Sequence, residues 1–224
     1  NSIARMAVRM GLGEVLNLEL PGELPGLIPT KKWKSKVLGA AWLGGESLIN
    51  AIGQGYVLAT PLQMAVMTAR VVNGGYAIVP RLIKALDNVD RPAQKATDFP
   101  PLGIYNRSLR LVQQAMDEVV NNPDGGTAYK ARIIGSGWQM GGKTGTSQVR
   151  RITLQEREAG LKKNEERPWR ERDHALFVGY APVSSPRYAC SVVVEHGGSG
   201  AKAAAPIARD VLREVRRLDP TGTR

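Results

Sequence analysis

The sequence has little cysteine, histidine or aromatic residue, and it has no long apolar run. Cys190 is its one cysteine, histidine occurs twice in 224 residues, and Phe, Trp and Tyr together make up 5%. A single cysteine excludes an intrachain disulfide and a cysteine-rich zinc site. The longest apolar runs, such as Val192-Val193-Val194, fall far short of the roughly 18 residues of a membrane-spanning helix. We therefore expect no metal, no cofactor and no spanning segment in this chain.

The chain also lacks an initiator methionine and an export signal. It opens at Asn1 in the middle of a helical pattern, without a basic segment followed by an apolar one. We therefore expect it to be a piece of a longer protein. With 42% hydrophobic and 23% charged residues, its composition is that of a globular chain. This excludes wholesale disorder and predicts one domain, or at most two.

The chain has little negative charge relative to positive charge. Lys and Arg number 31 and Asp and Glu 20, so the net charge is +11. Such an excess of positive charge is compatible with binding to nucleic acid, to an anionic lipid or to an anionic substrate, and equally with a surface that is only solvated. The basic residues are dispersed, and no RNA-recognition, zinc-finger or basic-zipper motif accompanies them. We expect no nucleic-acid partner.

Apolar residues recur at helical spacing in several segments. The spacing predicts helices over 1–15, 60–72 and 107–120 and a last helix that begins near Pro206. Thr60 is a natural N-cap for the second of these, and Gln63 completes a capping box. The last helix is expected to face a sheet with one apolar stripe: Ile207, Val211, Leu212, Val215 and Leu218.

The rest of the chain is predicted to be strands and loops. Strands are expected over 139–149, 174–182 and 187–195, the last two joined as an antiparallel hairpin. Residues 17–50, rich in Pro, Gly and Trp, are expected to form an extended, loop-rich connection. Residues 150–173 carry many charges of both signs and are expected to be a solvated, mobile excursion, partly helical at most.

These elements predict an α/β fold, an antiparallel sheet meander with packed helices. We divide the chain into a helix with a loop-rich connection (1–50), a helical part (51–135), and a three-strand meander with the C-terminal helix (136–218).

The run Gly141-Gly142-Lys143-Thr144-Gly145-Thr146-Ser147 carries the clearest chemistry. Gly145 would let a ligand approach the strand closely, because no Cβ intervenes. Lys143 would hold an anion or polarise a hydroxyl, and Thr144, Thr146 and Ser147 would hydrogen-bond a carboxylate. A backbone N–H on such a strand can stabilise an oxyanion. The same run also suits a surface strand with a solubilising lysine.

Neighbouring motifs favour the chemical interpretation. Lys143-Thr144-Gly145 is followed by the segment from Asp173 to Pro182, and it is preceded by Gly53-Gln54-Gly55-Tyr56 and by Thr60-Pro61-Leu62-Gln63. Together these resemble the C-terminal part of the transpeptidase domain of class B penicillin-binding proteins. The resemblance is greatest to the cell-elongation type, penicillin-binding protein 2, and it extends from about Ile3 to Leu218. The resemblance implies the penicillin-binding, serine β-lactamase-like fold.

The resemblance also implies an activity. In that family a serine attacks the terminal D-Ala-D-Ala of a peptidoglycan stem peptide, and an amine of a second stem resolves the acyl-enzyme. By motif position, Lys143 would supply charge and support proton transfer, and Thr144 and Thr146 would bind the terminal carboxylate. The N–H of Thr146 would form half of the oxyanion hole. The implied partners are stem peptides, β-lactams and a cell-elongation complex at the periplasmic face of the inner membrane, where an N-terminal helix tethers the parent protein.

Two motifs of the family are missing from the expected places. The nucleophile motif Ser-x-x-Lys and the motif Ser-x-Asn should both precede Lys143, so we expect this chain alone to be inactive. Ser199 and Lys202 match Ser-x-x-Lys but follow Lys143, in a flexible stretch, and are not expected to be catalytic. Adjacent strand residues point to opposite faces, so Asp173 and His174 are not expected to form part of a triad.

Other functions remain open at this point. A serine β-lactamase and a non-catalytic β-lactam sensor or pseudo-enzyme are the alternatives to a transpeptidase. In the family, further strands pair beside the 187–195 strand. Without them that strand would be an exposed edge, and the chain would tend to self-associate through it.

Overall fold

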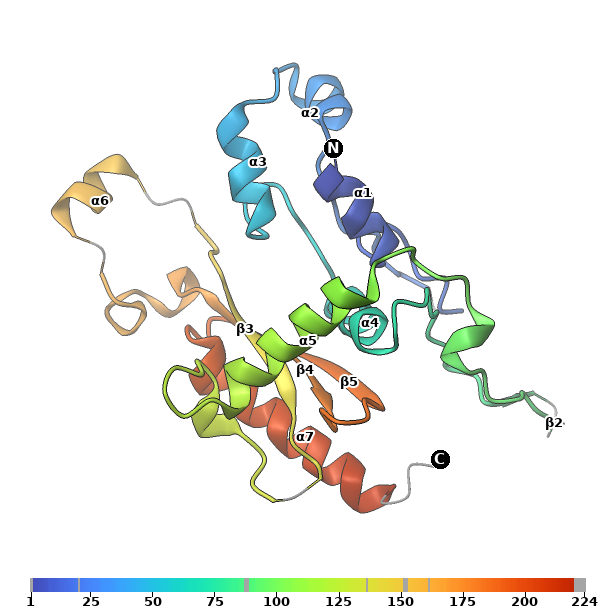
Figure 1. Cartoon of the computed structure of the whole chain (residues 1–224). Helices are drawn as coiled ribbons and strands as arrows, with labels where there is room; N and C mark the ends of the chain where they lie inside the picture. The colour runs from blue at the N-terminus through green and yellow to red at the C-terminus, as the bar shows by residue number, and fades with distance from the viewer. Residues whose placement is uncertain are drawn as a thin grey trace. The chain divides into compact units, whose positions relative to one another are not determined.

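The computed structural model describes residues 2–19, 21–86, 89–135, 137–150, 153–160 and 162–219 (Figure 1). It divides into two compact units, 1–109 and 110–224, which we call the first and the second unit.

Short helices joined by long loops make up the first unit. Its elements are α1 (Ser2–Arg9), α2 (Lys31–Leu38), α3 (Gly44–Ala51), α4 (Pro61–Val72), the two-stranded hairpin of β1 (Ala85–Leu86) and β2 (Val89–Asp90), and the 3₁₀ turn η1 (Ala96–Asp98). The predicted α4 is confirmed together with its cap. The Thr60 hydroxyl accepts from Gln63 N–H at 3.1 Å, and the Gln63 side chain accepts from Thr60 N–H at 3.0 Å.

The prediction that 17–50 is a loop-rich connection was wrong in part, because it contains α2 and α3. The Thr30 hydroxyl caps α2 by accepting from Trp33 N–H at 3.0 Å, and Gly39, with φ 62°, ends the helix. Lys34 Nζ lies 2.6 Å from Glu46 Oε1 and joins the two helices. Each helix is only eight residues long, and α3 buries none of them. Neither therefore shows the apolar stripe that would reveal it in the sequence.

The second unit is built around a three-stranded sheet. Its elements are α5 (Asn106–Asn121, mostly within this unit), η2 (Tyr129–Ala131), β3 (Gly141–Ser147), α6 (Leu154–Ala159), η3 (Asn164–Glu166), η4 (Trp169–Glu171), β4 (His174–Ala181), β5 (Tyr188–Val194), the π-helical turn η5 (Gly200–Ala204) and α7 (Ala205–Leu218). The strands pair antiparallel in the order β3-β4-β5, which confirms the predicted meander and the α/β class.

The core of the second unit lies between α7 and the sheet (Figure 1). Ala208 and Leu212 of α7 are buried there with Phe177 of β4. The predicted apolar face of α7 was partly wrong, because Ile207, Val211 and Leu218 remain about half exposed. The helix presents its small residues to the sheet, and this turns the larger apolar side chains toward its flanks.

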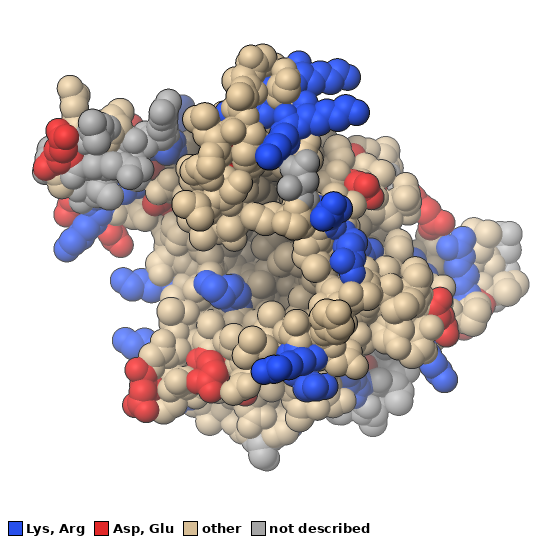
Figure 2. All heavy atoms as spheres, turned by 45° about the horizontal axis from the view of Figure 1, so that its top comes forward, with Lys and Arg blue, Asp and Glu red and all other residues tan. Residues whose placement is uncertain are grey.

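The basic residues do not form one patch on the face shown in Figure 2. Lys and Arg side chains are spread over it, with Asp and Glu between them. This agrees with the dispersed charge in the sequence.

Candidate active site

The predicted site residues lie on one strand at the edge of the sheet. Gly141–Ser147 forms β3, and among the described strands β3 pairs only with β4. Lys143 faces Val178 across the pair, and Ser147 faces His174. The other long side of β3 is therefore a strand edge with backbone groups available to an extended ligand.

Close packing fixes the position of β3, and it explains the glycines. A Cβ on Gly142 would lie 2.3 Å from the Phe177 ring, and a Cβ on Gly141 would lie 2.7 Å from the Tyr180 ring. The two aromatic side chains of β4 thus cover the start of β3, one on each face of the sheet. On the turn η5, a Cβ on Gly200 would lie 2.6 Å from the carbonyl oxygen of Gly145. Glycine is therefore needed at these positions to hold β3 in place.

Gly145 itself is less confined. A Cβ there would meet its nearest neighbour, the Leu176 Cβ, at 3.3 Å. The interpretation of Gly145 as the place where a ligand approaches the strand stays a prediction.

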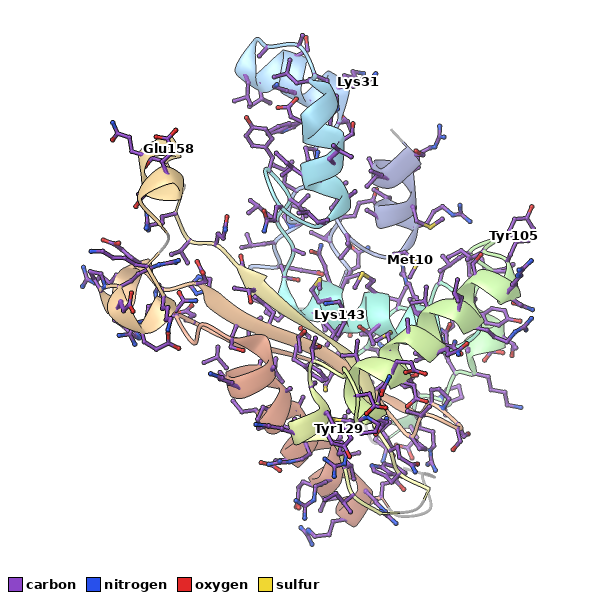
Figure 3. The ribbon with its side chains drawn as sticks, turned by 60° about the vertical axis from the view of Figure 1, so that its left-hand side comes forward. Met10, Lys31, Tyr105, Tyr129, Lys143 and Glu158 are labelled. Atoms are coloured by element: carbon purple, nitrogen blue, oxygen red, sulfur yellow. The ribbon has the colours of Figure 1, made fainter. Side chains whose placement is uncertain are left out.

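Alternation along β3 separates the site residues into two groups. Lys143, Gly145 and Ser147 lie on one face of the sheet, and Thr144 and Thr146 on the other. Lys143 is exposed on β3 (Figure 3), and its Nζ donates to the carbonyl oxygen of Thr144 at 2.7 Å. The structure thus joins Lys143 to the backbone of the strand edge. The side chains of Thr146 and Ser147 are exposed there.

Thr127, which the sequence did not single out, contacts the candidate site. Its hydroxyl oxygen lies 3.2 Å from that of Thr144, so the two hydroxyls share a hydrogen bond. The turn after α5 brings Thr127 there: Gly126 N–H donates to the Asn122 carbonyl at 3.0 Å, and Ala128 N–H to the Val119 carbonyl at 2.9 Å. The sequence shows only that a helix ends nearby, which does not indicate which strand the following threonine contacts.

Polar contacts join α5 to the start of β3 and to β4. Asn121 Nδ2 donates to the Met140 carbonyl, one residue before β3, at 3.0 Å. Tyr180 donates from its hydroxyl to the Gln113 carbonyl at 3.3 Å. Burial, with the negative charge of Asp117, raises the pKa of Tyr180 to about 12. The phenol is therefore neutral, and it acts as a structural donor and not as a base.

The charged excursion 150–173 has more local structure than the sequence suggests. Thr153 caps α6, and its N–H donates to Glu156 at 2.8 Å. The Arg150 side chain also donates to Glu156, at 2.7 Å. The hydrogen bond from the Thr153 backbone, and after it the bond from the Arg150 side chain, lowers the pKa of Glu156 to about 2. Partial helix formation in this excursion is confirmed, and Figure 3 shows Glu158 on α6.

Asp173 and His174 do not form an orienting pair, as expected. Asp173 accepts from Arg167 and from Asn164, both at 3.3 Å. His174 accepts at Nδ1 from the N–H of His196 at 2.9 Å. Each side chain is bound to a neighbour other than the adjacent residue, so the geometry provides no triad.

Two other motifs occur in the second unit. Ser199 is the N-cap residue of the helical turn η5, and its backbone carbonyl accepts from Lys202 N–H at 3.1 Å, so it does not lie in the irregular stretch that was expected. That Ser199 is not catalytic stays a prediction. Residues 137–144 match the phosphate-binding pattern Gly-x-x-x-x-Gly-Lys-Thr. Gly142 and Lys143 lie inside β3, however, and not in a loop that opens a helix.

Within the described part of the chain, no three His, Cys, Asp or Glu side chains gather as metal ligands would. The helices described there are all too short or too polar to cross a membrane.

Residues 1–213 match the family model of the penicillin binding protein transpeptidase domain. The peptidoglycan D,D-transpeptidase MrdA of Haemophilus influenzae is 36% identical over 208 residues, which cover 90% of this chain and 30% of that protein. The protein of the same name from Escherichia coli K12 is 32% identical over 215 residues, 92% of this chain and 32% of that one. The chain thus spans about a third of the length of these relatives.

Solved structures give the same result. PBP2 of Pseudomonas aeruginosa, in complex with WCK 5153, matches with a TM-score of 0.75 and 35% identity over 98% of this chain and 43% of that one. PBP2 of Helicobacter pylori, in a complex with MreC, matches with a TM-score of 0.75 and 29% identity over 96% of this chain and 35% of that one. The edge strand that carries Lys-Thr-Gly is consistent with the matching family model and with these relatives. The chain belongs to the penicillin-binding protein transpeptidase family.

Proposed function

We propose that this chain supplies the Lys-Thr-Gly side of a serine D,D-transpeptidase site, in which a stem peptide binds antiparallel along the open edge of β3. The observation that carries the proposal is the position of Lys143-Thr144-Gly145 on an edge strand. An extended peptide can add to such an edge through main-chain hydrogen bonds, while neighbouring side chains select its ends.

The contacts of Lys143 support particular roles. Its bond to the Thr144 carbonyl indicates that this carbonyl is accessible from outside the sheet. Backbone groups two residues apart point to the same side of a strand, so the N–H of Thr146 shares that edge. In the proposal this N–H stabilises the oxyanion of the reacting carbonyl. Thr144 and Thr146 bind the terminal carboxylate, and Thr127 orients the Thr144 hydroxyl.

In the proposed reaction, a serine from a preceding part of a longer parent protein attacks the carbonyl between the two terminal D-Ala residues. The C–N bond breaks, D-Ala leaves with the proton, and a serine ester forms. An amine of a second stem peptide then attacks the ester and releases the serine. Lys143 holds positive charge beside this centre and supports the proton transfers. β-Lactams would trap the same ester, and this chain alone would not react.

The names of the relatives suggest a setting. One similar structure is a complex of PBP2 with MreC. We propose that the parent protein works in a comparable elongation complex at the periplasmic face of the inner membrane, where an N-terminal helix anchors it. As an isolated chain it would self-associate through β5, which stands at the other end of the described sheet. Sedimentation at increasing concentration would measure this, and a monomer throughout would contradict it.

The test is the intact mass of the full-length parent protein and of this chain after exposure to benzylpenicillin. We expect an adduct on the full-length protein alone. We expect Lys143→Ala in that protein to slow adduct formation by about a hundredfold or more, because it removes the charge beside the reacting centre. Lys202→Ala is the matched control and should leave the rate unchanged.

Each other outcome has a definite meaning. An adduct on the isolated chain would restore Ser199 as a nucleophile. Absence of an adduct from both proteins would contradict the transpeptidase proposal and favour a pseudo-enzyme or binding module.

A further inference from the structure

A short loop, residues 195–199, joins β5 to the turn η5 and is bound to the start of β4. The N–H of Gly198 donates to the Asp173 carbonyl at 2.8 Å. The N–H of His196 donates to Nδ1 of His174 at 2.9 Å. The first bond joins two backbones, whereas the second depends on a side chain, the imidazole of His174.

The loop adopts a demanding conformation at His196. Its φ is 55°, in the left-handed region that residues other than glycine adopt at a cost in free energy. Nδ1 of the same residue lies 2.9 Å from the Arg172 carbonyl, which can only accept, so this ring donates there. The bond to His174 holds the backbone N–H of the same residue. Bonds from both the ring and the backbone therefore hold His196 in the conformation that the loop requires.

The loop leads directly to Gly200, which packs against the backbone of β3. A Cβ on Gly200 would lie 2.6 Å from the carbonyl oxygen of Gly145 and 3.0 Å from its nitrogen. The two backbones thus touch, with no room for a side chain between them.

This contact falls on the peptide group that matters most in the proposed reaction. The carbonyl of Gly145 and the N–H of Thr146 belong to one peptide unit, and a peptide unit is planar and rigid. Whatever fixes the carbonyl oxygen therefore also fixes the direction of the N–H. In the proposed function, that N–H stabilises the oxyanion of the reacting carbonyl.

We propose that His174 is a positioning residue for the N–H of Thr146. Its Nδ1 holds the backbone of His196, and the loop in turn holds Gly200 against the Gly145 carbonyl. That contact sets the plane of the peptide whose N–H faces the oxyanion. The inference rests on the proposed transpeptidase function and adds to it a residue that acts through the backbone of others.

Such a role affects one kinetic parameter more than another. Negative charge on the reacting oxygen develops only as the reaction proceeds, so a misdirected N–H weakens the transition state and leaves initial binding nearly unchanged. Loss of the His174 acceptor should therefore lower the limiting rate of acylation, and it should leave the half-saturating concentration as it was.

The test measures acylation of the full-length parent protein by fluorescent penicillin over a range of concentrations. His174→Phe keeps a ring but removes the acceptor, and it should lower the limiting rate about tenfold, because small displacements of a catalytic group are costly. His174→Asn is the matched variant. Its amide oxygen can accept where Nδ1 did, so it should restore most of the rate. The final amount of labelled protein should be the same for all three proteins.

A second variant tests the contact with β3. Gly200→Ala places a methyl group against the Gly145 carbonyl and should also lower the limiting rate. Combined with His174→Phe, it should slow the reaction by less than the product of the two separate effects, because both act on the same peptide. A combined effect equal to the product would contradict this route from His174 to β3.

The outcomes separate this inference from the function on which it rests. If penicillin labels the wild type and His174→Phe has the same limiting rate, the inference is wrong and the function stands. Equal slowing by His174→Asn and His174→Phe, or a smaller labelled amount at an unchanged rate, would likewise show that His174 is only structural. If penicillin labels none of the proteins, the proposed function fails and the inference fails with it.

Discussion

The two units of the molecule are stabilised by different kinds of contact. In the second unit, apolar residues from α5, β4 and α7 form one buried cluster, with partly buried residues of β5 packed against it; Val120, Met140 and Phe177 are fully buried in the cluster. In the described part of the first unit, the corresponding cluster comprises only Leu16, Leu18 and Val66, with Leu62 against it. Burial of apolar side chains therefore explains the stability of the second unit far better than that of the first.

Buried polar side chains compensate in the first unit. Arg70 donates from Nε and Nη2 to the Ile78 carbonyl at 3.2 and 3.0 Å, and from Nη1 to the Arg9 carbonyl at 3.0 Å. Gln63 donates to the carbonyls of Glu14 and Pro25 at 2.8 and 2.9 Å. These carbonyls belong to loops and to the last residue of α1, where secondary structure does not supply a donor. The comparison indicates that the loop-rich first unit is stabilised by buried side chains that donate hydrogen bonds to backbone carbonyls.

The largest expected effect comes from the apolar core of the second unit. Leu212→Ala should destabilise this unit by about 4 kcal/mol, because it removes buried methyl groups and leaves a cavity. Hydrogen exchange measured by mass spectrometry would report the loss in peptides of this unit separately from those of the first. Val211→Ala, on the exposed side of α7, is the matched control and should cost less than 1 kcal/mol.

A somewhat smaller effect is expected from the polar contacts of the first unit. Arg70→Met keeps much of the side chain volume but leaves the Ile78 and Arg9 carbonyls without their donor. It should destabilise this unit by about 3 kcal/mol in the same exchange experiment. Arg81→Met, at an exposed arginine, should change the stability by less than about 0.5 kcal/mol. Equal results for the two variants would show that the first unit does not depend on buried polar contacts.

The same contrast explains how much of the fold could be predicted. Periodic apolar residues correctly predicted α4, α5, β4, β5 and α7, because these elements bury one face. The strand β3 was predicted too, although its sequence has no apolar side chain. The helices α2 and α3 were missed because they are short and bury almost nothing. The face of α7 was partly misassigned because Ala205 and Ala208 pack against the sheet, while the larger Ile207 does not.

The candidate site was predictable to a similar degree. The motif Lys143-Thr144-Gly145 and its place on a strand followed from the sequence and from the resemblance. Its position at the sheet edge depends on strand order, which local residues do not determine. Thr127 could not be found, since its contact with Thr144 depends on how the turn after α5 meets β3. The rings of Trp169 and His196 meet through a similar long-range contact.

A smaller effect is expected at the capping box of α4. Thr60→Ala removes the acceptor of the Gln63 N–H and should destabilise the first unit by about 1 kcal/mol. Urea unfolding followed by circular dichroism would measure the change. Thr97→Ala, at an exposed threonine without a capping role, is the control. A loss as large as that of Arg70→Met would mean that local capping matters as much as the long-range polar contacts.

The smallest effect on stability is expected at Cys190, in the edge strand β5. Burial raises the pKa of this thiol from its ordinary value of 9.0 to about 11. The folded thiol keeps its proton where the unfolded one ionises, so its contribution to stability is present below pH 9 and is lost as the pH rises toward 11. At pH 8 iodoacetamide should modify the native chain about a hundredfold more slowly than the urea-unfolded chain, because less thiolate is present. Equal rates would show that β5 opens freely, and that the apolar core of the second unit does not protect its own edge.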